Sequence, residues 1–274
     1  MVHDLAACLP QRVEAWAFRT DIRFVEFFGL PGIGKTTASS RLADSLRRCG
    51  PLIGEVKVAW GRRTFIGRQI NRVGIVVPRL MDRRFRSVIV RIARFVIQSG
   101  QESILDAVRV IWNFSVLVAF IENERSKSYS IVVMDQGLLQ GFWSILLKSK
   151  RRTTSETWLE ILSAIGIHDM VFVHLRGEMG LARDRLLTRD DRSSRMQRAS
   201  PGSGPDLWSA ADCACREMAA DLGREMRAQD HAGALAMIDV ERLATPEVVA
   251  ERAFEKVLAC LDRHRLGELA DQRV

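Results

Sequence analysis

A glycine-rich run followed by a lysine and a hydroxyl is the clearest chemical signature in this chain. Residues 29–36 read Gly-Leu-Pro-Gly-Ile-Gly-Lys-Thr and follow an apolar, aromatic stretch. This G-x-x-x-x-G-K-T spacing is typical of a loop whose backbone N–H groups surround a chain of phosphates. A helix beginning near Lys35 would direct its positive end at the same anion. The sequence therefore predicts that the loop binds a nucleoside triphosphate.

The expected ligands of this site are a nucleoside triphosphate and Mg²⁺. We expect Lys35 to contact the terminal phosphates and the hydroxyl of Thr36 to bind the metal. The residues predicted to hold the nucleotide are Gly29, Leu30, Pro31, Gly32, Ile33, Gly34, Lys35, Thr36 and Thr37.

Asp135 is a second candidate, because it ends the apolar run at 131–134. In phosphate-loop proteins a carboxylate at such a place holds Mg²⁺, often through water, or activates the attacking group. The alternative is an ordinary turn residue at the end of a strand. The glycine loop upstream favours the first interpretation, so Thr36 and Asp135 form the predicted metal site.

An arginine cluster is the third candidate. Six arginines fall within residues 183–198, where a predicted helix meets the Gly-, Ser- and Pro-rich segment that ends at 205. Guanidinium groups stabilise the charge of a transferring phosphoryl group, and a mobile loop carrying them could close over the nucleotide. The alternative is a solvated basic helix end. The cluster predicts an Arg-rich lid at about 189–206.

Alternating strands and helices must position these groups. Strands are expected at 22–28, 52–58, 131–135, 170–175 and 234–240, and helices at 36–49, along 62–127, and at 137–148, 155–165, 177–189, from about 207, and 246–265. This order indicates an α/β fold with a central parallel sheet of about five strands and a helical insertion between the second and third. The site should lie at the carboxyl edge of the sheet, near Glu55, Asp135 and Arg176.

In motif and element order the chain resembles the nucleoside and nucleotide kinases, and within them the thymidylate-kinase-like proteins. The segments that carry this resemblance are 25–37, the strand ending at Asp135, and the Arg-rich segment after 171–175. The resemblance implies a P-loop NTPase fold, an ATP·Mg²⁺ donor and a lid that closes during transfer. Carried over residue by residue, it implies that Arg183, Arg189, Arg192 and Arg195 make the lid's contacts to phosphate and base, and that they join Lys35 and Asp135 as catalytic candidates. It also implies a kinase-like domain at 21–268 preceded by an extension at 1–20. Here Asp135 is followed by Gln136-Gly137, where that family usually has an arginine that meets the acceptor.

The sequence thus predicts an ATP-dependent phosphotransferase whose acceptor is a small molecule: a nucleoside, a nucleotide or another metabolite. The alternative is a phosphate-loop ATPase or regulatory module with no phosphorylated product, in which Gln136 could orient water. A third hypothesis follows from the net charge of +8 and from a basic amphipathic segment at 83–97. That segment could bind nucleic acid or an anionic membrane, or it could be an ordinary surface helix, which is the favoured interpretation. The sequence does not decide whether the chain forms a homodimer.

The cysteines and the N-terminal residues suggest a cytoplasmic protein. The five cysteines are scattered and odd in number, which does not indicate a disulfide framework. Cys213 and Cys215 lie two apart in a predicted helix, so their side chains should point apart. Asp4, Gln11 and Arg12 interrupt the N-terminal segment before any apolar signal core can form.

Overall fold

The computed structural model describes residues 22–48, 55–58, 65–101, 103–127, 130–149, 155–188, 196, 204–228, 235–242 and 244–271. The elements in these ranges are β1 Phe24–Gly29, α2 Lys35–Arg48, β2 Glu55–Val58, α3 Phe65–Arg79, α4 Arg83–Gln98, α5 Ile104–Arg125, β3 Ser130–Met134, α6 Leu138–Leu146, α7 Ser155–Ile165, β4 Met170–Gly177, α8 Met179–Leu187, α10 Gly204–Ala228, β5 Leu235–Val240 and α11 Pro246–Asp271.

The strands form one five-stranded sheet in the order β2-β3-β1-β4-β5. Every neighbouring pair is parallel. The central strands β1 and β4 are buried along nearly their whole length, as expected for strands covered on both faces. The expected parallel sheet of about five strands, flanked by helices, is confirmed.

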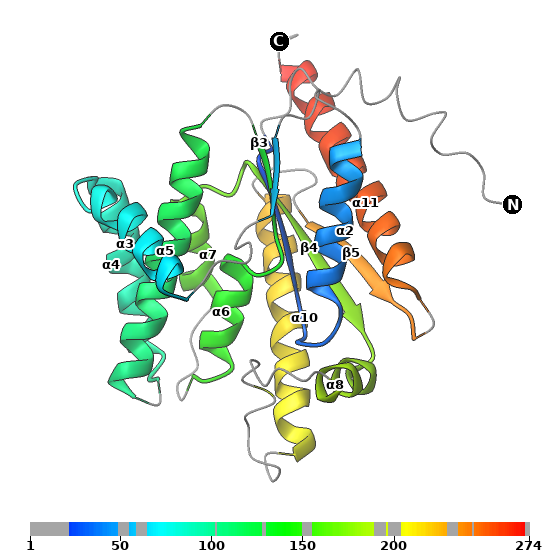
Figure 1. Cartoon of the computed structure of the whole chain (residues 1–274), viewed down its shortest axis with the longest axis horizontal. Helices are drawn as coiled ribbons and strands as arrows, with labels where there is room; N and C mark the ends of the chain where they lie inside the picture. The colour runs from blue at the N-terminus through cyan, green and yellow to red at the C-terminus, as the bar shows by residue number, and fades with distance from the viewer. Residues whose placement is uncertain are drawn as a thin grey trace, which may run out of the picture.

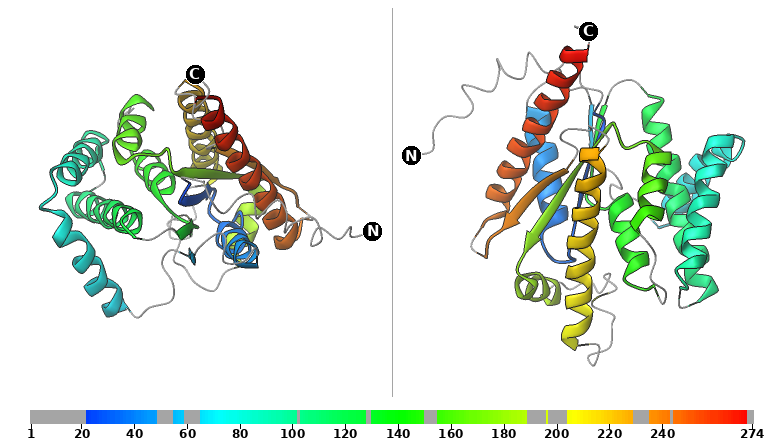
Figure 2. Two further views of the ribbon diagram at one scale, coloured as in Figure 1. Left: turned by 90° about the horizontal axis from the view of Figure 1, so that it is seen from above. Right: turned by 180° about the vertical axis from the view of Figure 1, so that it is seen from behind.

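Helices cover both faces of the sheet (Figure 1). Helices α2 and α11 pack together on one face, and α6 and α10 contact β1 on the other. Helices α3, α4 and α5 form the insertion between β2 and β3, with α3 and α4 packed on α5 (Figure 2). The insertion predicted at 62–127 is therefore present as three helices, which are separated after Arg79 and after Gln98.

Arg125, the last residue of α5, ties the insertion to the sheet. Its guanidinium donates to both carboxylate oxygens of Asp169, at 2.7 Å and 2.6 Å, and to the carbonyl of Ile165 at 2.6 Å. Asp169 directly precedes β4, and its backbone carbonyl accepts hydrogen bonds from the N–H groups of Arg23 and Phe24. One ion pair thus holds α5, α7 and the starts of β1 and β4 together.

One helix in the described ranges, α5, has the length and apolar composition of a membrane span. Its first turn is capped by the side chain of Ser103, and Asp106 pairs with Lys148 at 3.2 Å. Because α5 also packs against α3, α4 and α6, it serves as a core helix of the insertion.

Two predicted positions need correction. Glu55 is the first residue of β2 and pairs with Ser130, the first residue of β3, so it lies at the amino edge of the sheet and not at the carboxyl edge. Helix α10 begins at Gly204 rather than near 207, which removes 204–206 from the predicted lid. Pro205 belongs to the first turn of this helix, where its missing N–H costs no hydrogen bond.

Candidate functional site

The glycine loop connects the end of β1 to the start of α2 at the carboxyl edge of the sheet. Gly29 and Gly34 have φ angles of +140° and +108°, which residues with side chains rarely adopt. A Cβ atom added to Gly34 would meet nothing within 4 Å, whereas one added to Gly29 would lie 2.5 Å from the carbonyl oxygen of Leu175. The loop is therefore packed against β4 at its start and open around Gly34, where the first turn of α2 presents its N–H groups.

Lys35 is held inside this loop. Its ammonium group donates to the carbonyl oxygens of Gly29 at 2.7 Å and Leu30 at 2.9 Å, and the residue is only 8% exposed. The positive charge is thus fixed at the N-terminal end of α2, where the helix dipole adds to it. This combination favours an anion bound over the loop.

Thr36 and Asp135 come together across the sheet edge. The Thr36 hydroxyl donates to a carboxylate oxygen of Asp135 at 2.9 Å, although the two residues are 99 positions apart. Strand pairing explains this contact, because Glu26 in β1 is level with Met134 in β3. A hydroxyl and a carboxylate are hard oxygen ligands of the kind that Mg²⁺ accepts alongside phosphate oxygens and water. Within the described ranges, no group of three or more His, Cys, Asp or Glu residues could hold a metal by itself.

Glu26 is a buried carboxylate that sequence reasoning missed. It lies in the middle of β1, is fully buried, and accepts hydrogen bonds from the backbone N–H groups of Leu138 at 2.9 Å and Leu139 at 2.7 Å. Burial raises the pKa of Glu26 to about 7, although these N–H groups act in the opposite direction. A Cβ on Gly137 would lie 2.5 Å from the Glu26 side chain, so glycine is required there. Glu26 thereby fixes the start of α6, three residues after Asp135.

The rest of the loop leans toward α8. Gly32 is buried directly against Ala182 and Leu186 of that helix. Pro31 is half-buried, Ile33 is buried, and Thr37 is exposed on the first turn of α2. All nine residues predicted to hold the nucleotide thus belong to one continuous turn and helix start.

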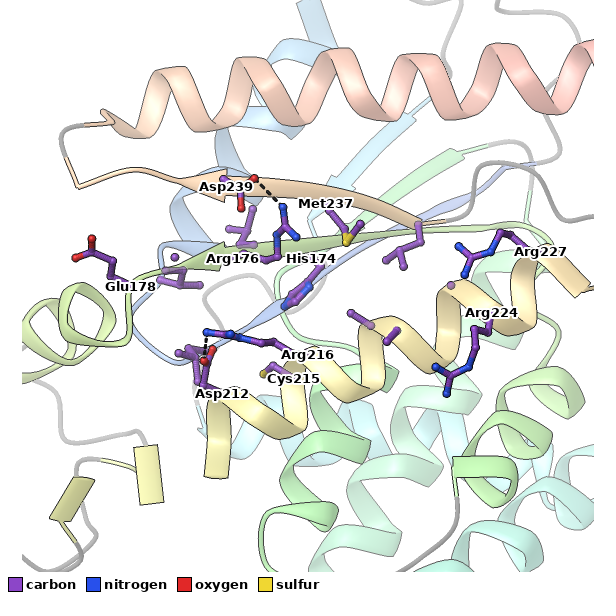
Figure 3. A pocket seen from close by; sticks show the side chains of 18 residues that line it. His174, Arg176, Glu178, Asp212, Cys215, Arg216, Arg224, Arg227, Met237 and Asp239 are labelled. Carbon is purple, nitrogen blue, oxygen red and sulfur yellow. Dashed lines mark hydrogen bonds and ion pairs between the residues drawn. The ribbon is translucent and has the colours of Figure 1, made fainter. Parts of the chain in front are cut away.

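A groove of about 850 Å³ adjoins the loop between α10 and the strands β4 and β5 (Figure 3). Leu30 and Ile33 of the loop line one part of it. Buried and exposed side chains alternate along β5, and one of the exposed ones, Met237, lines the groove and is 48% exposed.

His174 faces this groove from β4 and is 3% exposed. Its ring stacks on Phe28 with centroids 4.5 Å apart, and its Nδ1 atom has no hydrogen-bond partner among the described residues. Burial, followed by the positive charges of Arg176 and Lys35, lowers the pKa of His174 to about 4. The imidazole is therefore neutral at physiological pH, and sequence reasoning missed it because a histidine inside an apolar run carries no local signal.

Charged residues of the groove are largely paired. Arg176, at the carboxyl end of β4, bonds Asp239 of β5 at 2.7 Å, and Arg216 pairs with Asp212 on α10. Figure 3 shows both pairs beside His174. The pairing leaves this side of the loop polar but nearly balanced in charge.

Cys213 and Cys215 point apart, as predicted. Cys213 is exposed on α10, while Cys215 is buried in the groove wall. Burial raises the pKa of the Cys215 thiol to about 12, so it stays protonated. Neither cysteine has the character of a reactive nucleophile.

The arginine cluster is only partly described. Arg183 is exposed on α8, next to Ala182, which abuts Gly32 of the loop. Arg189, Arg192 and Arg195 lie outside the described residues, as do most of the predicted lid and the extension at 1–20. Gln136 is exposed directly after Asp135. The structure thus brings together the loop, Lys35, Thr36 and Asp135, and places Arg183 on the helix that supports the loop.

No family model matches the chain. No curated protein matches it either.

Proposed function

We propose that this protein is an ATP-dependent kinase with a P-loop NTPase fold, and that it transfers the γ-phosphoryl group to a small-molecule acceptor. The observation that carries the proposal is the 2.9 Å contact between Thr36 and Asp135 beside a glycine loop with Lys35 at its centre. The all-parallel sheet with β1 between β3 and β4 is compatible with that fold. The motif resemblance to thymidylate-kinase-like proteins points the same way.

Each residue has a distinct task in this proposal. The backbone N–H groups at the start of α2 and the ammonium of Lys35 bind and orient the phosphates. Thr36 and Asp135 would hold Mg²⁺, which neutralises charge on the phosphates when it is bound. Glu26 fixes the start of α6 and with it the segment that carries Asp135. Arg183 would approach the phosphates from α8.

The alternative is an ATPase or a regulatory module that forms no phosphorylated product. Gln136 favours it, because this amide is exposed beside Asp135, where the resembling kinases carry an arginine for the acceptor. A polar amide near the γ-phosphate can orient a water molecule for hydrolysis.

A transfer screen decides between the two. Purified protein is incubated with γ-labelled ATP and Mg²⁺ and with nucleosides, nucleotides and sugars one at a time, while ADP release is measured in parallel. The kinase proposal expects ADP release that one acceptor class stimulates, with label recovered in that acceptor. ADP release that no acceptor changes, with all label in inorganic phosphate, would favour the ATPase. Absence of both ATP binding and ADP release would reject both.

A further inference from the structure

The positive charge of the chain is concentrated in one part of the helical insertion. Residues 65–101, which we call the basic insertion, contain eight arginines, no lysine and a single acid, Asp82. Their net charge is +7, against +8 for the whole chain. The remaining residues are therefore nearly neutral together, and the basic character of the protein belongs to α3, α4 and the turns beside them.

Helix α4 divides sharply into two faces. Its buried side chains are Phe85, Val88, Ile92, Phe95 and Val96, which pack into the core. The opposite face carries Arg83, Arg86, Val90, Arg94 and Ile97, spaced three or four residues apart, and all of them are exposed. We call these five residues the outer stripe. Helical spacing of this kind places them in one line along the helix surface.

The outer stripe mixes cations with bare aliphatic groups. Val90 is 48% exposed and Ile97 is 67% exposed. Leu80 and Met81, in the turn that leads into α4, are also exposed. Together with the arginines, these aliphatic groups give the outside of α4 a surface that is both cationic and apolar.

The arginines of α4 are not neutralised by neighbouring acids. Arg83, Arg84, Arg86, Arg91 and Arg94 make no ion pair with any residue in the described ranges. The guanidinium groups of Arg84 and Arg86 donate instead to backbone carbonyls, those of Ala164 at 3.4 Å and Leu80 at 2.8 Å. Their positive charge therefore remains available to an anionic partner.

We infer that the outer stripe of α4 docks the protein on an anionic membrane surface. The arginines would meet lipid headgroup phosphates, and Val90 and Ile97 would enter the boundary between headgroups and acyl chains. Helix α4 lies on the outside of the insertion, away from the glycine loop (Figure 2). Docking would therefore leave the phosphate-loop edge of the sheet accessible.

Two other occupants fit less well. A protein that binds single-stranded nucleic acid through a basic face commonly adds aromatic side chains for base stacking, whereas both phenylalanines of α4 point into the core. In a symmetric dimer through this face, the net charge of +7 on one copy would oppose the same charge on the other. An anionic lipid surface offers negative charge to the arginines of the outer stripe and an apolar phase to its aliphatic side chains.

The test is flotation of the full chain with vesicles, without nucleotide, so that it does not depend on kinase activity. One set of vesicles is phosphatidylcholine and the other contains about 30% phosphatidylglycerol, at about 0.1 M and about 1 M salt. We expect binding to the anionic vesicles alone, weakened at the higher salt. The triple variant Arg83→Gln, Arg86→Gln, Arg94→Gln should bind about a hundredfold more weakly, since each arginine near such a surface contributes about fivefold.

Two further variants make the result specific. Val90→Ser with Ile97→Ser keeps the charge and should weaken vesicle binding by about tenfold, because aliphatic burial is lost. The control variant Arg41→Gln, Arg47→Gln, Arg48→Gln removes three exposed arginines from α2, a helix outside the insertion. This variant should bind vesicles like the parent.

Four results would overturn the inference. The first is equal binding to both kinds of vesicle, and the second is an equal loss of vesicle binding in the α2 control variant. The third is a dimer of the parent that becomes monomeric in the Val90→Ser, Ile97→Ser variant. The fourth is binding to an oligonucleotide that is tighter than binding to vesicles and that the Val90→Ser, Ile97→Ser variant does not weaken.

Discussion

The phosphate-loop edge and the basic insertion treat positive charge in opposite ways. At the sheet edge, Lys35 is bonded to two backbone carbonyls and Arg176 is paired with Asp239. On α4, five arginines face solvent without an acidic partner among the described residues. The first arrangement fixes a cation at one place, as a site for a small anion requires. The second spreads charge over a helix, as an extended anionic surface requires.

The largest expected effect is at the loop. Lys35→Ala should remove detectable phosphoryl transfer and weaken ATP binding, because the loss of a charged donor to a transferring phosphoryl group costs about 3 kcal/mol or more in transition-state energy. Turnover and ATP affinity are measured together with circular dichroism to verify folding. Lys256→Ala, an exposed lysine on α11, serves as the matched control and should behave like the parent. A folded Lys35→Ala protein with parental ATP affinity and turnover would refute the proposed function.

The buried carboxyl group of Glu26 predicts a pH dependence of stability. Its pKa is about 7 in the folded protein and 4.5 as the ordinary value, so between these values the folded state keeps a proton that the unfolded state has lost. The stabilising contribution is therefore complete below pH 4.5 and declines as pH rises to about 7, by about 3 kcal/mol in total.

Urea unfolding at a series of pH values measures this contribution. Glu26→Gln has no proton to exchange, so the free energy of unfolding of the parent should fall relative to that of the variant as pH rises from 5 toward 8. Parallel profiles for the two proteins would show that Glu26 has an ordinary pKa. This test isolates the buried carboxyl group of Glu26 in the central strand β1.

Local signals predicted the loop, and tertiary contacts produced what was missed. Gly29, Gly34, Lys35 and Thr36 are neighbours in sequence, so their spacing alone placed them, and Asp135 followed from the end of an apolar run. Glu26 was not predicted, because its role depends on the N-terminus of α6, more than a hundred residues away.

The remaining errors have equally specific causes. Glu55 was misplaced because the register of β2 against Ser130 cannot be read from the residues of β2 itself. The start of α10 was placed too late because Gly204-Pro205 is typical both of a loop and of the first turn of a helix.

Asp135→Asn should have an intermediate effect. The variant retains size and hydrogen-bonding ability but loses the charge that would help to hold Mg²⁺, so we expect ATP binding to persist and turnover to fall by about tenfold to a hundredfold. Turnover as a function of Mg²⁺ concentration is the measurement, and the variant should need more Mg²⁺ to reach half of its maximal rate. Asp44→Asn on α2 is the control, because this carboxylate pairs with Arg47. If Asp135→Asn and Asp44→Asn give the same Mg²⁺ dependence, Asp135 is only a turn residue.

The smallest expected effect concerns the stability contributed by the outer stripe. Val90→Ser and Ile97→Ser should each change the free energy of unfolding by less than about 0.5 kcal/mol, because both side chains are already in contact with water. Phe95→Ala on the same helix should lower the free energy of unfolding by about 3–5 kcal/mol. Phe95 is fully buried, and its ring packs edge-on against Phe142 with the ring centroids 5.7 Å apart.

Chemical denaturation of the three variants gives this contrast directly. A near-zero cost at 90 and 97 would mean that these aliphatic residues do not stabilise the isolated chain, as the membrane-docking inference expects. A cost of several kcal/mol at either position would instead place that side chain in a packed interface within the protein. The outer stripe would then be an ordinary part of the fold. The only remaining difference between α4 and the sheet edge would be that Arg176 at the sheet edge has an acidic partner, whereas the arginines of α4 have none among the described residues.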